Sequence, residues 1–139
     1  MRVVLDTNVV ISAMRSPAGV SAALLRLVLN RQIISLVSVP LSLEYEEKCM
    51  EHAAKAGLTT GDAIALFQAI VAVSEKVENH FLWRPSLPDP DDEMVLETAV
   101  NGRADAIISY NYRDFGHVPA SLNIAVLTPP DAIWRFYNV

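Results

Sequence analysis

The sequence has a single cysteine, Cys49, and lacks the features of secreted and membrane proteins. One cysteine excludes an intrachain disulfide and any thiolate-rich zinc or iron–sulfur site. The first apolar run meets Asp6 too early for a secretory signal, and no apolar run reaches the roughly 18 residues of a membrane span. We therefore expect a soluble, cytoplasmic protein with no membrane partner.

Basic residues are also scarce. Lysine and arginine number 11 against 16 acidic residues, which gives a net charge of −5. This balance opposes the sequence-independent capture of nucleic acid that basic proteins achieve. If the substrate is a nucleic acid, metal ions and a local basic patch must offset the repulsion between the negative charge of the protein and the phosphates. The histidines His52, His80 and His117 show no metal-type spacing, and we expect them to be structural or surface residues.

Repeats, linkers and low-complexity tracts are absent from the 139 residues, and 52% of the chain is apolar. A chain of this length can bury a proper core. We expect one domain over residues 1–139.

Alternating strands and helices are predicted along the chain. Short apolar runs predict strands at Val3–Leu5, Ile33–Val39, Ala106–Ser109 and Ile124–Leu127. Helical spacing predicts helices at Ser21–Asn30, Leu41–Ala56, Asp62–Val77, Pro90–Gly102 and Asp131–Tyr137. The fold class is therefore α/β, a three-layer α/β/α sandwich with a central, mainly parallel sheet of four to five strands. Ligands of such sheets bind beyond the carboxyl ends of the strands.

Acidic residues stand at or near those strand ends, and each also has a structural explanation. Asp6 follows the first strand, where it could cap a helix beginning near Val9. Glu44 lies one turn into the helix after the second strand, but it is also spaced i,i+4 from Lys48, as in an ordinary surface ion pair. Local sequence leaves both alternatives open.

The stretch Leu87–Leu96, LPDPDDEMVL, places four acids in five positions ahead of an apolar run. Helix capping and solvation account for Asp89, Asp91 and Glu93, since negative charge is favoured in the first helical turn. The stretch Ser109–Phe115, SYNYRDF, follows the third strand with a hydroxyl, an amide, a cation and a carboxylate. Three separate crossovers thus bring acids to one edge of the sheet.

These segments resemble the PIN domain, the metal-dependent nuclease fold found in VapC-type toxins. The resemblance covers essentially the whole chain and rests on an ordered set of four motifs. They are VVLDTN at 3–8, Glu44 in a Leu-Glu-Tyr context, DDEMVLETA at 91–99, and ADAIIS at 104–109 leading to residue 111.

The resemblance implies that Asp6, Glu44 and Asp92 are metal-binding, catalytic carboxylates. It also implies that Asn8 and Ser109 are supporting polar groups that orient ligands and water. At the position of Asn111 family members usually carry Asp, so the sequence departs from the pattern there. An amide oxygen can still bind a cation, and Asp114, one turn further on, could substitute as a catalytic and metal-binding acid.

The chemistry of such a cluster favours a hard divalent cation. Two carboxylates about 4 Å apart repel by roughly 4 kcal/mol at an effective dielectric near 20, so a cation or a proton must neutralise the group. Carboxylate and amide oxygens suit Mg²⁺ or Mn²⁺. Arg15 and Arg113 are possible contacts to substrate phosphates, since guanidinium groups bind phosphate oxygens.

The predicted function is a metal-dependent endoribonuclease, the toxin of a toxin–antitoxin pair, which hydrolyses RNA by metal-activated water. The resemblance also implies a cognate antitoxin protein and a possible homodimer. The main alternative is a catalytically weakened PIN-like module that binds a protein or RNA partner. In this alternative, Asn111 indicates the weakened catalysis. A phosphoryl-accepting protein with Asp6 as nucleophile is disfavoured, because Asn8 stands where a dehalogenase-type fold needs Asp and no lysine follows Lys76.

Overall fold

The strands form one parallel sheet. The computed structural model describes residues 1–80 and 87–138. Its strands there are β1 (Arg2–Leu5), β2 (Ile34–Val37), β3 (Glu75–Lys76), β4 (Ala106–Ile108) and β5 (Ala125–Leu127). They lie in the order β3-β2-β1-β4-β5, and every neighbouring pair is parallel. The predicted sheet is confirmed, with five strands and β1 at its centre.

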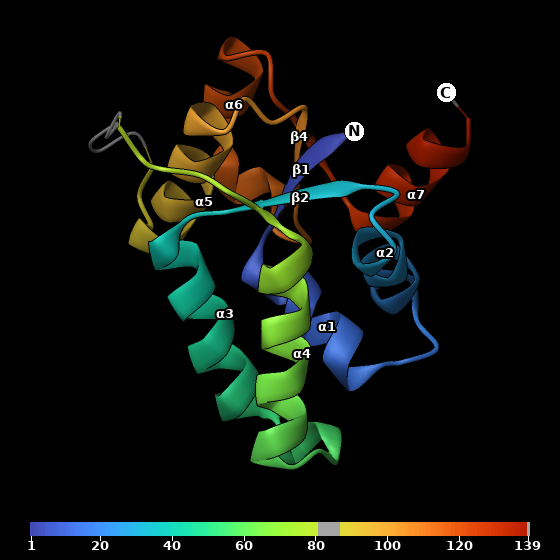
Figure 1. Cartoon of the computed structure of the whole chain (residues 1–139). Coiled ribbons are helices and arrows are strands. Elements are labelled where there is room, and N and C mark those ends of the chain that lie inside the picture. Colours follow the sequence, from blue (N-terminus) through green and yellow to red (C-terminus); the bar gives the residue numbers. More distant parts are fainter. Residues whose placement is uncertain (81–86, 139) are drawn as a thin grey trace.

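Helices cover both faces of this sheet and complete the predicted α/β/α sandwich (Figure 1). They are α1 (Thr7–Arg15), α2 (Val20–Leu29), α3 (Val39–His52), α4 (Thr60–Val73), α5 (Pro90–Asn101), α6 (Val118–Ser121) and α7 (Pro129–Tyr137). Two 3₁₀ turns, Ala54–Ala56 and Tyr112–Phe115, join them. Helices α1 to α4 contact one another, and α7 packs on α2. Helix α5 packs against β1, β2 and β4.

Burial explains why the central strands carry no alternating pattern. In β1, Val3, Val4 and Leu5 are fully buried, and so are the three residues of β4. A parallel strand covered on both faces needs apolar side chains in both directions. The buried central strands therefore hold in place the polar residues that follow their carboxyl ends.

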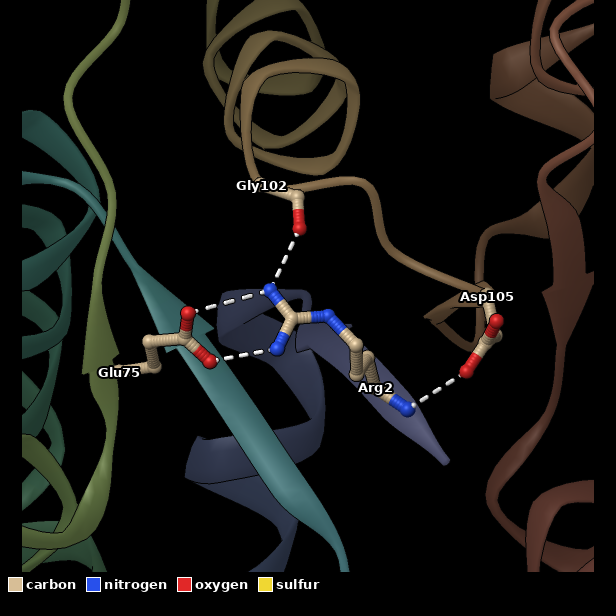
Figure 2. A network of polar contacts seen from close by, with 4 residues as sticks. All are labelled: Arg2, Glu75, Gly102 and Asp105. Carbon is tan, nitrogen blue, oxygen red and sulfur yellow. Dashed lines mark hydrogen bonds and ion pairs between the residues drawn. The ribbon is translucent and has the colours of Figure 1, made fainter.

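The amino-terminal edge of the sheet is held by a polar network around Arg2 (Figure 2). Its Nη1 donates to Glu75 Oε2 at 2.6 Å and its Nη2 to the Gly102 carbonyl at 2.7 Å. The backbone N–H of Arg2 donates to Asp105 Oδ2 at 2.8 Å. Arg2 thus links β1, β3 and the end of α5. This network lies at the edge of the sheet opposite the one where Asp6 follows β1.

The helix predicted at Asp62–Val77 is wrong at its end. Helix α4 stops at Val73, and Glu75–Lys76 pair with β2 as the short edge strand β3. Ser74 makes the break: it is extended, and its hydroxyl donates to the Ile70 carbonyl. The apolar run carries helical spacing through the break, so periodicity alone could not locate it. None of the helices in residues 1–80 and 87–138 is long and apolar enough to cross a membrane.

Candidate active site

A cleft of about 600 Å³ opens at the carboxyl edge of the sheet. Its walls come from α1, α3, the start of α5 and the segment after β4. The acids that line it are Asp6, Glu44, Asp89, Asp91, Asp92 and Asp114. Asn8, Arg15 and Asn111 line it as well. The acids that the sequence analysis singled out therefore share one cavity, although they are up to 108 positions apart in the numbering from Asp6 to Asp114.

Asp6 combines the helix cap that local sequence offered with a position in the cleft. Its backbone N–H continues the β1–β4 ladder by donating to the Ile108 carbonyl at 2.9 Å. Its Oδ1 accepts from the Thr7 N–H at 2.8 Å as the N-cap of α1, which begins at Thr7 and not near Val9. The side chain also lines the cleft. Capping thus fixes the carboxylate at the strand end without removing it from the site.

Ser109 and Asn8 support this carboxylate. The Ser109 hydroxyl is fully buried and donates to Asp6 Oδ2 at 2.6 Å, a charge-assisted hydrogen bond. Ser109 Oγ in turn accepts the Asn111 N–H at 2.9 Å, and Asn8 Nδ2 donates to it at 3.4 Å. Through these hydrogen bonds, Ser109 directly and Asn8 by way of Ser109 hold Asp6 in one orientation.

Glu44 lies on the cleft side of α3 and does not form the ion pair with Lys48 that was its structural alternative. Lys48 instead pairs with Glu51 at 3.4 Å. The neighbouring residue, Tyr45, is fully buried, and its hydroxyl donates to the Leu5 carbonyl. Since Leu5 precedes Asp6, this bond positions α3 relative to the end of β1. The two carboxylates are therefore placed by their immediate neighbours.

Asp92 is buried at the start of α5, with 8% of its surface exposed. The helix begins as predicted, with Pro90 in its first turn and the Asp89 side chain accepting the Asp91 N–H at 2.9 Å. The expectation that Glu93 is solvated is wrong. Glu93 is buried and accepts a hydrogen bond from the Leu87 N–H. This bond ties the segment before α5 to the first turn of the helix.

The remaining predicted residues lie nearer the surface. Asn111 and Asp114 are exposed at the mouth of the cleft. Arg15, at the end of α1, lines the cleft too. Arg113 does not: its guanidinium carbon lies 5.6 Å from the centroid of the Tyr112 ring, over an adjoining pocket. Of the two arginines, Arg15 is thus the one placed to meet a ligand in the cleft.

Burial and mutual repulsion raise the pKa of the inner acids. For Asp92, desolvation is the main cause, followed by the charge of Asp6, and together with weaker repulsion from other acids they bring the pKa to about 6. Desolvation also raises the pKa of Asp6, against the opposing hydrogen bonds from Ser109 and Thr7. The pKa of Glu44 is raised by desolvation and by the charge of Asp91. When the three carboxyl groups are ionised, their negative charges repel and destabilise one another.

Comparison with known proteins assigns the family. A family model described as PIN domain matches residues 2–113, the greater part of the chain. The chain belongs to the PIN domain family. The matched range includes Asp6, Glu44 and Asp92, so the resemblance inferred from the sequence motifs is confirmed.

A solved structure with the same fold is VapBC2 from Rickettsia felis, bound to a DNA fragment from their promoter. The match has a TM-score of 0.66 at 13% identity and covers 92% of this PIN domain and 98% of that chain. A search of curated proteins gave no match. At this identity the solved structure supports the fold of this PIN domain and says nothing of its individual residues.

The donors in the cleft fit a hard divalent cation by their chemistry. They are carboxylate and amide oxygens, which suit Mg²⁺ or Mn²⁺. Burial and the charges of neighbouring acids raise the pKa values of Asp6, Glu44 and Asp92, and a bound cation would offset both effects. Within the described ranges no three acidic, histidine or cysteine side chains stand close enough to hold an ion as they are placed. Binding would therefore draw the carboxylates together.

Substitution of Asp92 is expected to change how stability depends on pH. The folded pKa of about 6 exceeds the ordinary 3.8, so folding favours the protonated acid. The stability that Asp92 contributes is full below about pH 4 and is lost as pH rises through 6. Relative to Asp92→Asn, metal-free wild type should lose on the order of 2 kcal/mol between those limits. Urea unfolding in EDTA at several pH values measures this difference.

The control for this experiment is Asp131→Asn, which removes an exposed acid from the first turn of α7, outside the cleft. Its stability relative to wild type should not change in the same window. A difference between Asp92→Asn and wild type that stays constant from pH 4 to 7 would contradict the raised pKa of Asp92.

Sequence reasoning missed the cleft positions of Asp91, Lys48 and His52. Capping explains Asp91 in the sequence, but the residue is exposed and faces the other acids closely enough to raise the pKa of Glu44. Lys48 and His52 have the sequence context of surface or structural residues, yet both line the cleft. The signal that could have found them is the i,i+4 spacing of Glu44, Lys48 and His52, which puts all three on one face of α3.

Proposed function

We propose that this PIN domain is a divalent-metal-dependent endoribonuclease and the toxin component of a toxin–antitoxin pair. The observation that carries the proposal is the convergence of Asp6, Glu44 and Asp92, from three separate crossovers, on one cleft at the carboxyl edge of the sheet. Their raised pKa values support it, because such a group calls for a cation.

The residues have distinct parts in the proposed reaction. Asp6, Glu44 and Asp92 would hold the Mg²⁺ or Mn²⁺, and Asn111 and Asp114 would add ligands at the mouth. When bound, the metal would supply positive charge to the acids and Lewis acidity for the attack of water on phosphorus and for the leaving oxygen. Ser109 keeps Asp6 oriented through its hydrogen bond, and Arg15 contacts a phosphate. Hydrolysis leaves a 5′-phosphate and a 3′-hydroxyl.

A cognate antitoxin is the proposed protein partner. The proposal is supported by the fold shared with VapBC2 from Rickettsia felis. It rests on likeness of fold and on membership of the PIN domain family.

The test is cleavage of labelled RNA by the purified protein. Cleavage is expected with Mn²⁺ or Mg²⁺, should stop in EDTA, and should return when excess metal is added, because the site cannot act while its acids repel one another. Analysis of the product ends should find 5′-phosphates. Cleavage that persists in EDTA would refute a metal-dependent mechanism.

A second candidate is a catalytically weakened PIN module that acts by binding. The observation that favours it is Asn111, an amide lining the cleft where the family usually carries a carboxylate. An amide brings no charge, so the outer part of the site would bind metal weakly. Absence of cleavage by the wild type, together with cleavage by Asn111→Asp, would favour this candidate.

A further inference from the structure

The cleft extends from the acids toward a basic end formed by α1 and α3. On α3, Glu44, Lys48 and His52 recur every four residues and all line the cleft. With 1.5 Å of rise per residue, Lys48 lies about 6 Å and His52 about 12 Å along the helix axis from Glu44. The charge changes sign along this line from the Glu44 carboxylate to the Lys48 ammonium, and the line ends at the His52 imidazole.

Helix α1 forms the facing side and shows the same change. Asn8, Ile11, Ser12 and Arg15 line the cleft at spacings of three and four residues, so one face of α1 runs along it. The helix begins beside Asp6 and ends at Arg15. Since α1 and α3 are in contact, Arg15 and the pair Lys48 and His52 lie at the same end of the cleft.

The Lys48 ammonium is accessible to a ligand. The partner of Lys48 is Glu51, in an exposed pair whose side chains are 35% and 57% accessible. Such a pair contributes little to stability, so Lys48 can exchange it at small cost. His52 Nδ1 has no hydrogen-bond partner among the residues described. The atom is buried, so its polar group is unsatisfied in the absence of a ligand.

We propose that Lys48 and His52, with Arg15, form a phosphate-binding track for single-stranded RNA next to the scissile bond. The inference rests on the proposed ribonuclease function and extends it to how the strand lies in the cleft. In a chain with a net charge of −5, a local basic end is what a polyanion needs to enter an acidic site. Lys48 and Arg15 neutralise phosphates flanking the reacting one, and His52 donates a hydrogen bond.

The test is the salt dependence of RNA binding. The probe is a short, labelled single-stranded RNA of mixed sequence, and the Asp6→Asn protein with Mg²⁺ keeps it intact. Lys48→Gln in this background should reduce the slope of log affinity against log salt by about 0.7, the value for one phosphate contact to a single strand. The dissociation constant near 0.1 M salt should rise about five-fold, since one contact is lost.

Lys55→Gln is the matched control. Lys55 is exposed on the 3₁₀ turn after α3 and does not line the cleft, so this variant changes the net charge equally. It should leave the salt slope unchanged, and Lys48→Arg should restore it. Thermal melting of each variant checks that the fold is intact.

The outcomes separate this inference from the proposed function. If wild type cleaves RNA but Lys48→Gln binds it as Lys55→Gln does, the track is refuted and the ribonuclease stands. If wild type does not cleave, yet Lys48→Gln alone lowers the slope, the track stands and the ribonuclease fails. If the protein binds no RNA, both are overturned.

Discussion

Asp6→Asn is expected to lower the rate of metal-dependent RNA cleavage by at least about 100-fold. The substitution removes the charge that lies at the end of the central strand, beside Ser109. Asparagine can still accept the Thr7 N–H that Asp6 caps, so α1 should keep its start. Initial rates of cleavage over a range of Mn²⁺ concentrations measure the loss and show whether excess metal recovers it.

The loss of activity must be separated from loss of fold. Because burial and nearby charges raise the pKa of Asp6, metal-free Asp6→Asn should be at least as stable as wild type at neutral pH. Asp131→Asn makes the same acid-to-amide change on α7, outside the cleft, and should cleave at the wild-type rate. Cleavage by Asp6→Asn at the wild-type rate would remove Asp6 from the proposed site.

Mn²⁺ is expected to stabilise the folded protein by about 2.7 kcal/mol at about 100 times its dissociation constant. Binding at the proposed site would relieve the repulsion among Asp6, Glu44 and Asp92 in the folded protein, whereas the unfolded chain would gain little. Thermal melting with and without Mn²⁺ at neutral pH should show a rise in Tm of several degrees. The rise should shrink at low pH, because protons compete with the metal for the carboxylates.

Two variants test whether the Mn²⁺ ion binds in the cleft. Asn111→Asp adds a carboxylate at the mouth of the cleft and should strengthen the Mn²⁺ response while lowering the stability of metal-free protein. Asp92→Asn should weaken the response. An equal Mn²⁺ shift in wild type, Asn111→Asp and Asp92→Asn would place the bound ion elsewhere on the protein.

The sequence was sufficient where a feature depends on nearby residues. The central strand ending at Asp6 is an unbroken apolar run, and the helix start at Asp89 and Pro90 has the capping pattern of its residue types. The parallel sheet followed because buried strands alternate with helices. Local patterns of this kind were enough to predict that Asp6 lies at the carboxyl edge of the sheet, whereas the place of Asp92 was implied by the resemblance to the PIN domain family.

Features that depend on packing between distant segments were not predicted correctly. The short strand Glu75–Lys76 exists because it pairs with β2, and its residues alone look helical. A contact over a shorter separation was missed as well: Glu93 is buried and accepts the Leu87 N–H, although its sequence neighbours suggest a solvated turn. Lys48 and His52 reach the cleft only because α3 packs on α1 along that face. To predict such contacts, one must know how two packed helices are rotated relative to each other, and local sequence does not give this rotation.

The buried Tyr45 hydroxyl has a consequence for mutational scanning. It joins the residue after Glu44 to the residue before Asp6, yet Tyr45 has no exposed surface. In a scan scored by RNA cleavage, Tyr45→Phe should lower activity through the loss of this hydrogen bond, although no ligand can touch the ring. Maps of sensitivity on this protein should therefore be interpreted with the Tyr45–Leu5 tether in view, and not by solvent accessibility alone.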